Sequence, residues 1–189
     1  MNRNQPYDIW SISGAKAMSN TLKVEAAVDG GRDPVTHEKL TTLGCTAHGF
    51  LTGHVYIQGT TNYDGMRKIY SVATNSITIV APYVAETPGG TETVKSMISF
   101  NHPIEFLGVQ LALSAAGGAN EAFQAIVDAA AGAAFDTRYH NTADMTSIKY
   151  VDDFFDGPKP LKANDKLDFT YANTNSRTWG LKIFTRRLA

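Results

Sequence analysis

The side chains of this chain best suited to bind a metal ion are its histidines, His37, His48, His54, His102 and His140. His48 and His54 flank a glycine-bordered segment, so a loop could bring the two rings together. A catalytic zinc site takes three protein ligands, and the nearest third candidates, His37 and Asp64, belong to no ligand motif. We therefore expect no metal site, and predict that His48 belongs to its loop motif, with its ring hydrogen-bonded to backbone.

Carboxylates offer the next possible chemistry. Asp152 and Asp153 are adjacent, and neighbouring residues of a strand point to opposite faces, so they cannot form the facing pair that a glycosidase needs. Asp136, Asp144 and Asp168 would have to be gathered by folding, which the sequence alone does not show. A hydrolase that acts on surface polysaccharide therefore stays a minor alternative.

Nucleophilic and phosphate-binding motifs are missing from the sequence. There is no Gly-x-Ser-x-Gly elbow, and the glycines at Gly14 and at 117–118 lack the neighbours of a phosphate-cradling loop. The one cysteine, Cys45, can form neither an internal disulfide nor a cysteine-based zinc cluster. We expect a protein that is not an enzyme and binds no cofactor.

Composition narrows the class of protein further. The 189 residues carry 17 basic and 18 acidic side chains, a net charge of -1, whereas a protein that wraps nucleic acid normally has a large basic excess. Hydrophobic residues make up 43%, enough for a core. No leader peptide is recognisable, and the longest weakly polar stretch, 111–135, is interrupted by charged residues. We expect a soluble protein from a reducing compartment, with no nucleic-acid or membrane partner.

Alternation of apolar and polar residues predicts an all-β chain in two modules. Over 21–87, short alternating runs at 22–28, 55–59 and 77–81 are separated by turns such as Asp29-Gly30-Gly31 and Asp64-Gly65, which favours a small antiparallel β-barrel. The Pro-Gly-Gly segment at 88–93 is the predicted linker.

The second predicted module, 94–189, is a jelly-roll-like β-sandwich. Its alternating runs lie at 94–100, 104–112, 123–128, 135–139, 148–155, 166–172 and 179–185. The alanine-rich segment 120–134 has two interpretations: a strand pair with a tight loop, which the flanking strands favour, or a helix capped by Asn120. Residues 1–20 form a predicted N-terminal arm, which either docks onto another molecule or packs back onto its own domain.

A motif with regularly placed glycines, HGFLTGHVYIQGTTNYDG, lies at 48–65 and is continued by apolar runs at 69–72 and 77–79. This stretch resembles a small β-barrel repeat of bacteriophage virion proteins. That repeat is often labelled as similar to the first catalytic-cysteine half-domain of ubiquitin-activating enzymes. The resemblance implies a fold and no catalysis, because Cys45 precedes the motif.

A second stretch, LKANDKLDFTYANTNSRTWGL at 161–181, is similar to the last strands of jelly-roll head and tail proteins of tailed phages, with Asn164 where the family favours glycine. Together the two resemblances imply a virion structural protein, a head decoration (cement) protein that forms a homotrimer on the capsid surface. Its implied partners are itself and the major capsid protein or another virion protein, and it would be made in the host cytoplasm. The alternative is a tail, fibre or baseplate module that binds host-surface glycan or another tail protein.

Candidate interface residues are the aromatic, apolar and basic side chains that a neighbouring subunit or the capsid would contact. In the N-terminal arm they are Tyr7, Ile9 and Trp10. Of the adjacent pair Phe154 and Phe155, we expect one ring to face the core and the other to face outward. Near the C-terminus they are Arg177 and Trp179.

Overall fold

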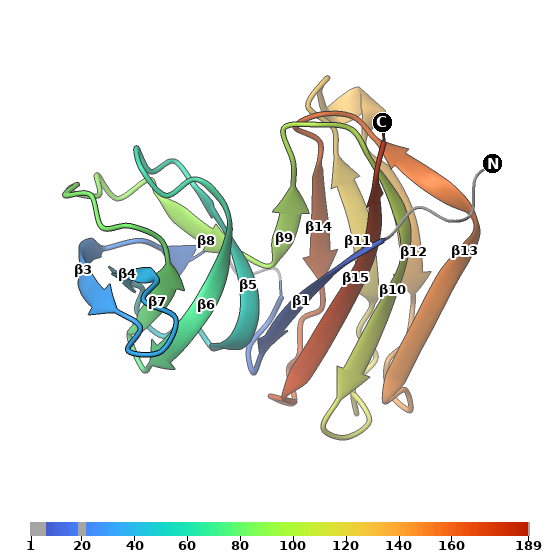
Figure 1. Cartoon of the computed structure of the whole chain (residues 1–189). Helices are drawn as coiled ribbons and strands as arrows, with labels where there is room; N and C mark the ends of the chain where they lie inside the picture. Colours follow the sequence, from blue (N-terminus) through green and yellow to red (C-terminus); the bar gives the residue numbers. More distant parts are fainter. Residues whose placement is uncertain (1–6, 19–21, 189) are drawn as a thin grey trace.

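The computed structural model describes residues 7–18 and 22–188 (Figure 1). Its regular elements are almost all strands. They are β1 (Asp8–Gly14), β2 (Leu22–Lys23), β3 (Ala26–Arg32), β4 (Lys39–Gly44), β5 (Phe50–Gln58), β6 (Gly65–Ala73), β7 (Ser76–Val80), β8 (Thr93–Lys95), β9 (Met97–Ser99), β10 (Ile104–Leu113), β11 (Phe123–Asp128), the 3₁₀ turn η1 (Ala133–Phe135), β12 (Thr137–Thr142), β13 (Tyr150–Leu161), β14 (Lys166–Thr170) and β15 (Trp179–Arg187). The all-β fold class is confirmed.

The larger module is a sandwich with jelly-roll connectivity. One layer has the order β13-β10-β15-β1, and the other has the order β12-β11-β14-β9 (Figure 1). The first strand pairs with the last, β9 with β14, β10 with β13 and β11 with β12, all antiparallel. This pattern is a long hairpin rolled into two sheets, which is how eight strands form a jelly roll.

The smaller module is a curved antiparallel sheet. Its strands follow the order β3-β4-β7-β6-β5, and β8 joins β5 to β2. The sequence predicted a barrel here, but the pairing among the described residues does not close into one. Alternation also missed β4, in which Leu40, Thr41 and Leu43 are all buried, because two consecutive buried residues hide the period of two.

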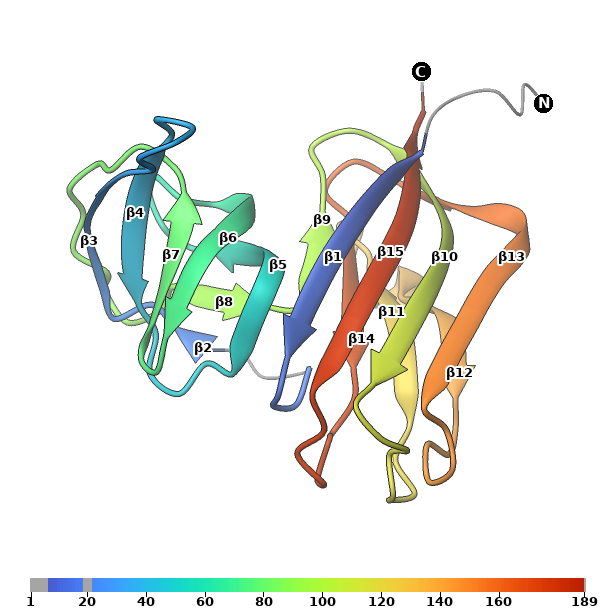
Figure 2. The same ribbon diagram turned by 60° about the horizontal axis from the view of Figure 1, so that its bottom comes forward.

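The two modules do not follow each other along the chain in the predicted order of barrel, linker and sandwich. The smaller module is inserted between β1 and β9 of the jelly roll, and β1 pairs with β15 on one side and β5 on the other (Figure 2). One sheet therefore runs through both modules. The run predicted at 94–100 is split at buried Ser96, so that β8 pairs within the small module and β9 within the sandwich.

The N-terminal segment is part of this sheet. Of the two interpretations that the sequence left open for residues 1–20, the described part, β1, follows the second: it packs onto its own domain. Its partner β15 lies at the other end of the chain, in register from Asp8 opposite Thr185 to Gly14 opposite Trp179. Residues 1–6 and 19–20 of the predicted arm lie outside the described residues.

The alanine-rich segment 120–134 contains a strand and a loop. β11 and β12 form an antiparallel pair, and η1 lies in the loop between them. Asp136 and Asp165 hold this loop by accepting hydrogen bonds from the backbone N–H groups of Ala129 (2.9 Å) and Ala130 (3.0 Å). The preferred interpretation of a strand pair is confirmed, and tertiary pairing outweighs the helix propensity of alanine.

Candidate functional site

The β13-β10-β15-β1 layer lies in front of the second layer in Figure 2, and its outer face carries the candidate surface. Residues opposite each other in register share a face, so this surface is a grid of rows that cross four strands. From the end nearest the termini, the first row is Ile9, Phe184, Gly108 and Phe154, the second is Ser11, Lys182, Gln110 and Asp152, and the third is Ser13, Gly180, Ala112 and Tyr150.

The first row and Tyr7, which precedes β1, form an exposed apolar patch, which we define as Tyr7, Ile9, Phe154 and Phe184. Tyr7, Ile9 and Phe154 are 58%, 51% and 53% exposed. Phe184 is nearly covered, since the rings of Tyr7 and Phe154 lie 6.1 Å and 4.7 Å from it, centroid to centroid. The fold thus brings together three of the predicted interface residues from opposite ends of the chain.

Gly108 makes room for this patch. A Cβ atom at this position would lie 2.4 Å from the carbonyl oxygen of Asp153 and 3.0 Å from a ring carbon of Phe154. The Phe154 ring and the β13 backbone can therefore approach β10 this closely only because residue 108 has no side chain.

The other predicted interface residues do not join the patch. Phe155 points inward, as expected for one member of the pair, and its ring stacks edge-on against buried Phe106 at 5.0 Å. Trp10 is half-buried and packs at 5.2 Å against His54 of the small module. Arg177 is partly buried in the turn before β15.

Trp179 is a core residue, which corrects its assignment to an interface. It is 3% exposed, and its indole N–H donates a 2.7 Å hydrogen bond to the carbonyl oxygen of Lys16. The alternation of Trp179, Leu181 and Ile183 with Gly180 and Lys182 already places the Trp179 ring on the apolar face of β15, and that face packs against the second sheet.

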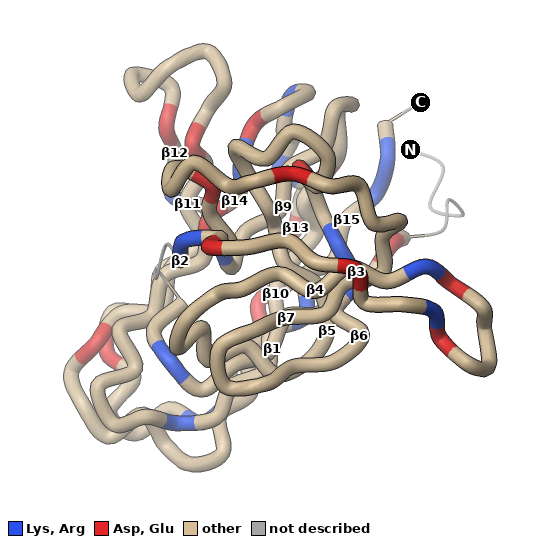
Figure 3. Tube along the Cα trace, turned by 90° about the vertical axis from the view of Figure 1, so that its left-hand side faces the viewer, with Lys and Arg blue, Asp and Glu red and all other residues tan. Residues whose placement is uncertain are grey.

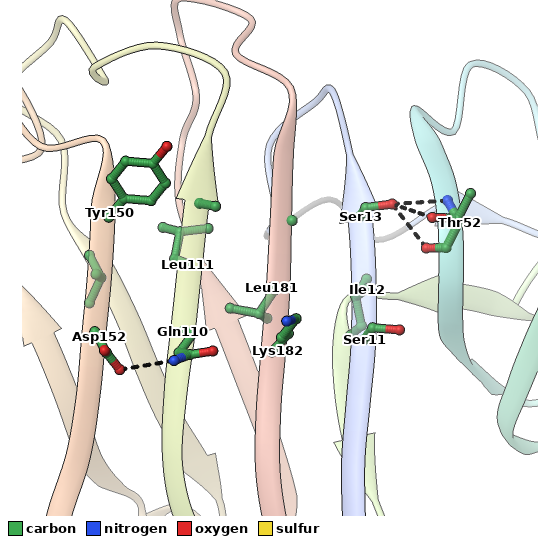
Figure 4. A pocket seen from close by; sticks show the side chains of 13 residues that line it. Ser11, Ile12, Ser13, Thr52, Gln110, Leu111, Tyr150, Asp152, Leu181 and Lys182 are labelled. Carbon is green, nitrogen blue, oxygen red and sulfur yellow. Dashed lines mark hydrogen bonds between the residues drawn. The ribbon is translucent and has the colours of Figure 1, made fainter.

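The second and third rows line a groove (Figure 4). Its volume is about 500 Å³, and it extends from Tyr150 at one edge of the layer to Thr52 of β5 at the other. Its charged and amide side chains come from separate strands: Asp152 from β13, Gln110 from β10 and Lys182 from β15. Hydroxyl groups come from β1 and β5, those of Ser11, Ser13 and Thr52. The sequence analysis did not find this site, because only the strand register places these residues in rows.

Each of the two histidines considered for metal binding is used locally. The His48 ring accepts a hydrogen bond from the N–H of Phe50 at Nδ1 (3.0 Å), so its Nε2 donates to the carbonyl oxygen of Ala73 (2.7 Å), which confirms the predicted loop role. His54 lies 3.2 Å from the carbonyl oxygen of Ser11, and burial lowers its pKa. Among the described residues, no three metal-ligating side chains gather at one point.

The candidate carboxylates are also dispersed. Asp152 and Asp153 point to opposite faces, as predicted: Asp152 accepts from Gln110 on the outer face, whereas Asp153 contacts His140. The side-chain and backbone hydrogen bonds from Thr146 lower the pKa of Asp144, and burial raises the pKa of Asp168. The charge of Asp128 also raises the pKa of Asp168, and neither Asp144 nor Asp168 lines the groove described above.

A buried polar chain that the sequence analysis missed joins β12 to β13. The Nδ1 atom of His140 lies 2.5 Å from a carboxylate oxygen of Asp153, and its Nε2 lies 2.9 Å from the hydroxyl of Thr142. His140 is 9% exposed, and its ring packs against Phe123 at 5.2 Å. With both nitrogens engaged and the ring covered, this chain ties the two layers of the sandwich together at one edge.

We expect Asp153→Ala to lower the free energy of unfolding by about 1–3 kcal/mol, because the buried His140 ring loses the acceptor of its Nδ1 proton. Urea denaturation measures the change. Thr142→Val, which removes the neutral hydroxyl partner of the other nitrogen, should cost less than removal of the carboxylate. Equal stability of Asp153→Ala and the wild type would show that the contact is not part of the fold's stability.

Cys45 is buried, and burial raises the pKa of its thiol from an ordinary 9.0 to about 11. We expect a disulfide exchange reagent to label it at pH 8 only after unfolding, since the thiolate is the nucleophile.

Above pH 9 the unfolded chain releases the thiol proton of Cys45 while the folded chain keeps it, so stability should fall from pH 9 to 11. Cys45→Ser should remove that pH-dependent loss, and rapid labelling of the native protein would contradict the assignment.

Charged side chains of both signs are interspersed over the surface. Along the β3–β4 hairpin, the acidic residues Asp29, Asp33 and Glu38 lie among the basic residues Arg32 and Lys39, so no basic stretch forms there (Figure 3). No helix in the described part of the chain is long and apolar enough to cross a membrane.

Comparison of the chain with models of known protein families, with curated proteins and with solved structures finds no match. The case for a function therefore depends on the geometry of the surface and on the resemblances of the two sequence stretches.

Proposed function

We propose that this chain is a non-enzymatic structural protein of a tailed-phage particle. In this proposal it is a homotrimeric decoration protein on the capsid surface that binds the major capsid protein and stabilises the head lattice. The stretches at 48–65 and 161–181 support it by their resemblance to virion modules, and the jelly-roll order of the sandwich is compatible with the second resemblance.

The observation that carries the proposal is the exposed apolar patch. Tyr7, Ile9 and Phe154 are each about half exposed, and covering what remains of such side chains contributes roughly 1 kcal/mol each. A decoration protein works by burying surface of this kind against neighbours, offset by the entropy lost on docking. The rigid sheet beneath the patch limits that entropy cost.

We expect the variant with Tyr7→Ser, Ile9→Ser and Phe154→Ser to bind capsid shells about a hundredfold more weakly than the wild type, the equivalent of the roughly 3 kcal/mol of lost burial. Co-sedimentation of purified protein with empty, tail-less heads measures this binding. Phe135→Ser, which alters an aromatic residue 64% exposed in η1, between β11 and β12 of the other layer, is the matched control.

Two results would count against the proposal. If the triple variant and the wild type sediment with the shells equally, the patch is not the docking surface. If the wild type binds tails and no heads, the alternative of a tail module replaces the decoration role. Analytical ultracentrifugation of the free protein tests the trimer separately.

A further inference from the structure

We propose that the groove on the outer sheet face is a binding site for a neutral saccharide. It lies at the end of the face away from the apolar patch, over the second and third rows of the grid (Figure 4). This inference does not depend on a role in the capsid, since a head or a tail protein can carry such a site.

The shape of the groove fits one or two sugar rings. Its volume of about 500 Å³ lies within the range of small-ligand sites, roughly 300–1,000 Å³. Its floor is flat, because the third row places Gly180 and Ala112 side by side on adjacent strands. A Cβ atom at Gly180 would meet no heavy atom within 4 Å, so space is open directly above the backbone.

The wall of the groove is an aromatic ring. Tyr150 is 66% exposed at the edge strand β13 and stands opposite Ala112 in register. The ammonium group of Lys149, which does not line the groove, lies 5.3 Å from the ring centroid and helps to hold the ring in place. An exposed aromatic ring beside a flat floor is suited to the apolar face of a pyranose, since its body is apolar and its hydroxyl is polar.

The polar atoms of the groove indicate a ligand rich in hydroxyl groups and without net charge. Gln110 donates a 3.2 Å hydrogen bond to one oxygen of Asp152, which leaves the other carboxylate oxygen and the amide oxygen of Gln110 as acceptors. Lys182 supplies donors, and among the described residues no carboxylate lies within ion-pair distance of it. The carboxylate of Asp152 disfavours a phosphate, and the ammonium group of Lys182 disfavours a cation. A neutral hydroxyl group can accept from Lys182 and donate to Asp152.

The test is a titration of the full-length protein with neutral sugars, followed by NMR chemical shifts of backbone amides. The panel contains glucose, galactose, mannose, N-acetylglucosamine, lactose and cellobiose, each taken to about 10 mM, with heparin oligosaccharide as an anionic comparison. We expect at least one neutral sugar to shift the amides of Gln110, Asp152 and Gly180 in a saturable way.

Two variants locate the binding. Tyr150→Ala should weaken the binding about tenfold by removing the wall, and Gly180→Val should abolish it by filling the floor where a side chain meets no other atom. Phe135→Ala removes an exposed aromatic residue elsewhere and should leave binding unchanged. The proposal is overturned if no neutral sugar shifts these amides, if heparin alone does, or if Gly180→Val binds as well as the wild type.

Measurement of shell binding distinguishes this proposal from the proposed function. We expect Gly180→Val to bind capsid shells like the wild type while losing sugar binding, because the apolar patch is unchanged. The patch variant should show the reverse. Loss of shell binding in Gly180→Val would mean that the groove belongs to the docking surface, and would overturn its assignment as a separate saccharide site.

Discussion

Replacing Gly53 by alanine is expected to lower the free energy of unfolding by more than about 3 kcal/mol. Gly53 lies where β5 of the small module pairs with β1 of the jelly roll, opposite Ile12. Its φ of 99° is costly for any residue with a Cβ atom, of the order of 1–3 kcal/mol. The added Cβ would also lie 2.2 Å from the carbonyl oxygen of Ser11, so the two backbones would have to separate.

Gly157→Ala is the matched control, because Gly157 lies in a strand with no positive φ and no atom within 4 Å of its added Cβ. That variant should stay within about 0.5 kcal/mol of the wild type. Urea denaturation measures both. Since one sheet runs through the two modules, Gly53→Ala should lower the midpoint of a single transition. Two separate transitions in the wild type would contradict a continuous sheet, and an unchanged midpoint would contradict the close approach at Ser11.

Local alternation was enough to place most strands of the sandwich. In β14 and the residue after it, Leu167, Phe169 and Tyr171 are buried while Asp168 and Thr170 between them are not, which is the pattern that the sequence displays. Such strands have one face against the core and one toward solvent, so the period of two survives in the sequence.

The sequence could not place β1, because its pairing is the least local in the fold. Ile9 lies opposite Phe184, and Ile12 lies opposite Leu181. No residue pattern near β1 or β15 in the sequence indicates that these two strands pair. The alternation of Ile12 and Gly14 with Ser11 and Ser13 is too short to separate a strand of the sandwich from an arm that reaches a neighbour. The insertion of the small module after β1 separated the two parts of the jelly roll and hid its order.

The sequence also indicated some residues of the candidate sites, but not how the fold brings them together. Tyr7, Ile9 and Phe154 were found as individual apolar residues, and their assembly into one patch depends on strand register. The groove left no signal, because Gln110 and Lys182 are ordinary polar residues of outward-facing strand positions. A site built from rows that cross four strands becomes visible only when the pairing of those strands is known.

Trp179→Ala is expected to cost about 3–5 kcal/mol of the free energy of unfolding, the range for deleting a buried large aromatic side chain. The Trp179 ring packs over Gly14, where an added Cβ would lie 2.7 Å from a ring carbon, and its N–H satisfies the carbonyl oxygen of Lys16. The side chain therefore fastens the end of β1, and the chain that leaves it, to β15. Thermal or urea unfolding measures the loss.

This variant separates a core role from an interface role for Trp179. A residue that only contacts a partner would leave unfolding unchanged when truncated and would weaken shell binding. Trp179→Phe keeps most of the packing and removes the hydrogen bond, so it should cost less than Trp179→Ala. The difference between the two losses in free energy of unfolding measures the contribution of the packed ring. Phe135→Ala, at a loop position 64% exposed, is the control and should change stability by less than about 0.5 kcal/mol. A large loss confined to the Trp179 variants would establish that this tryptophan stabilises the jelly roll by packing β1 against β15.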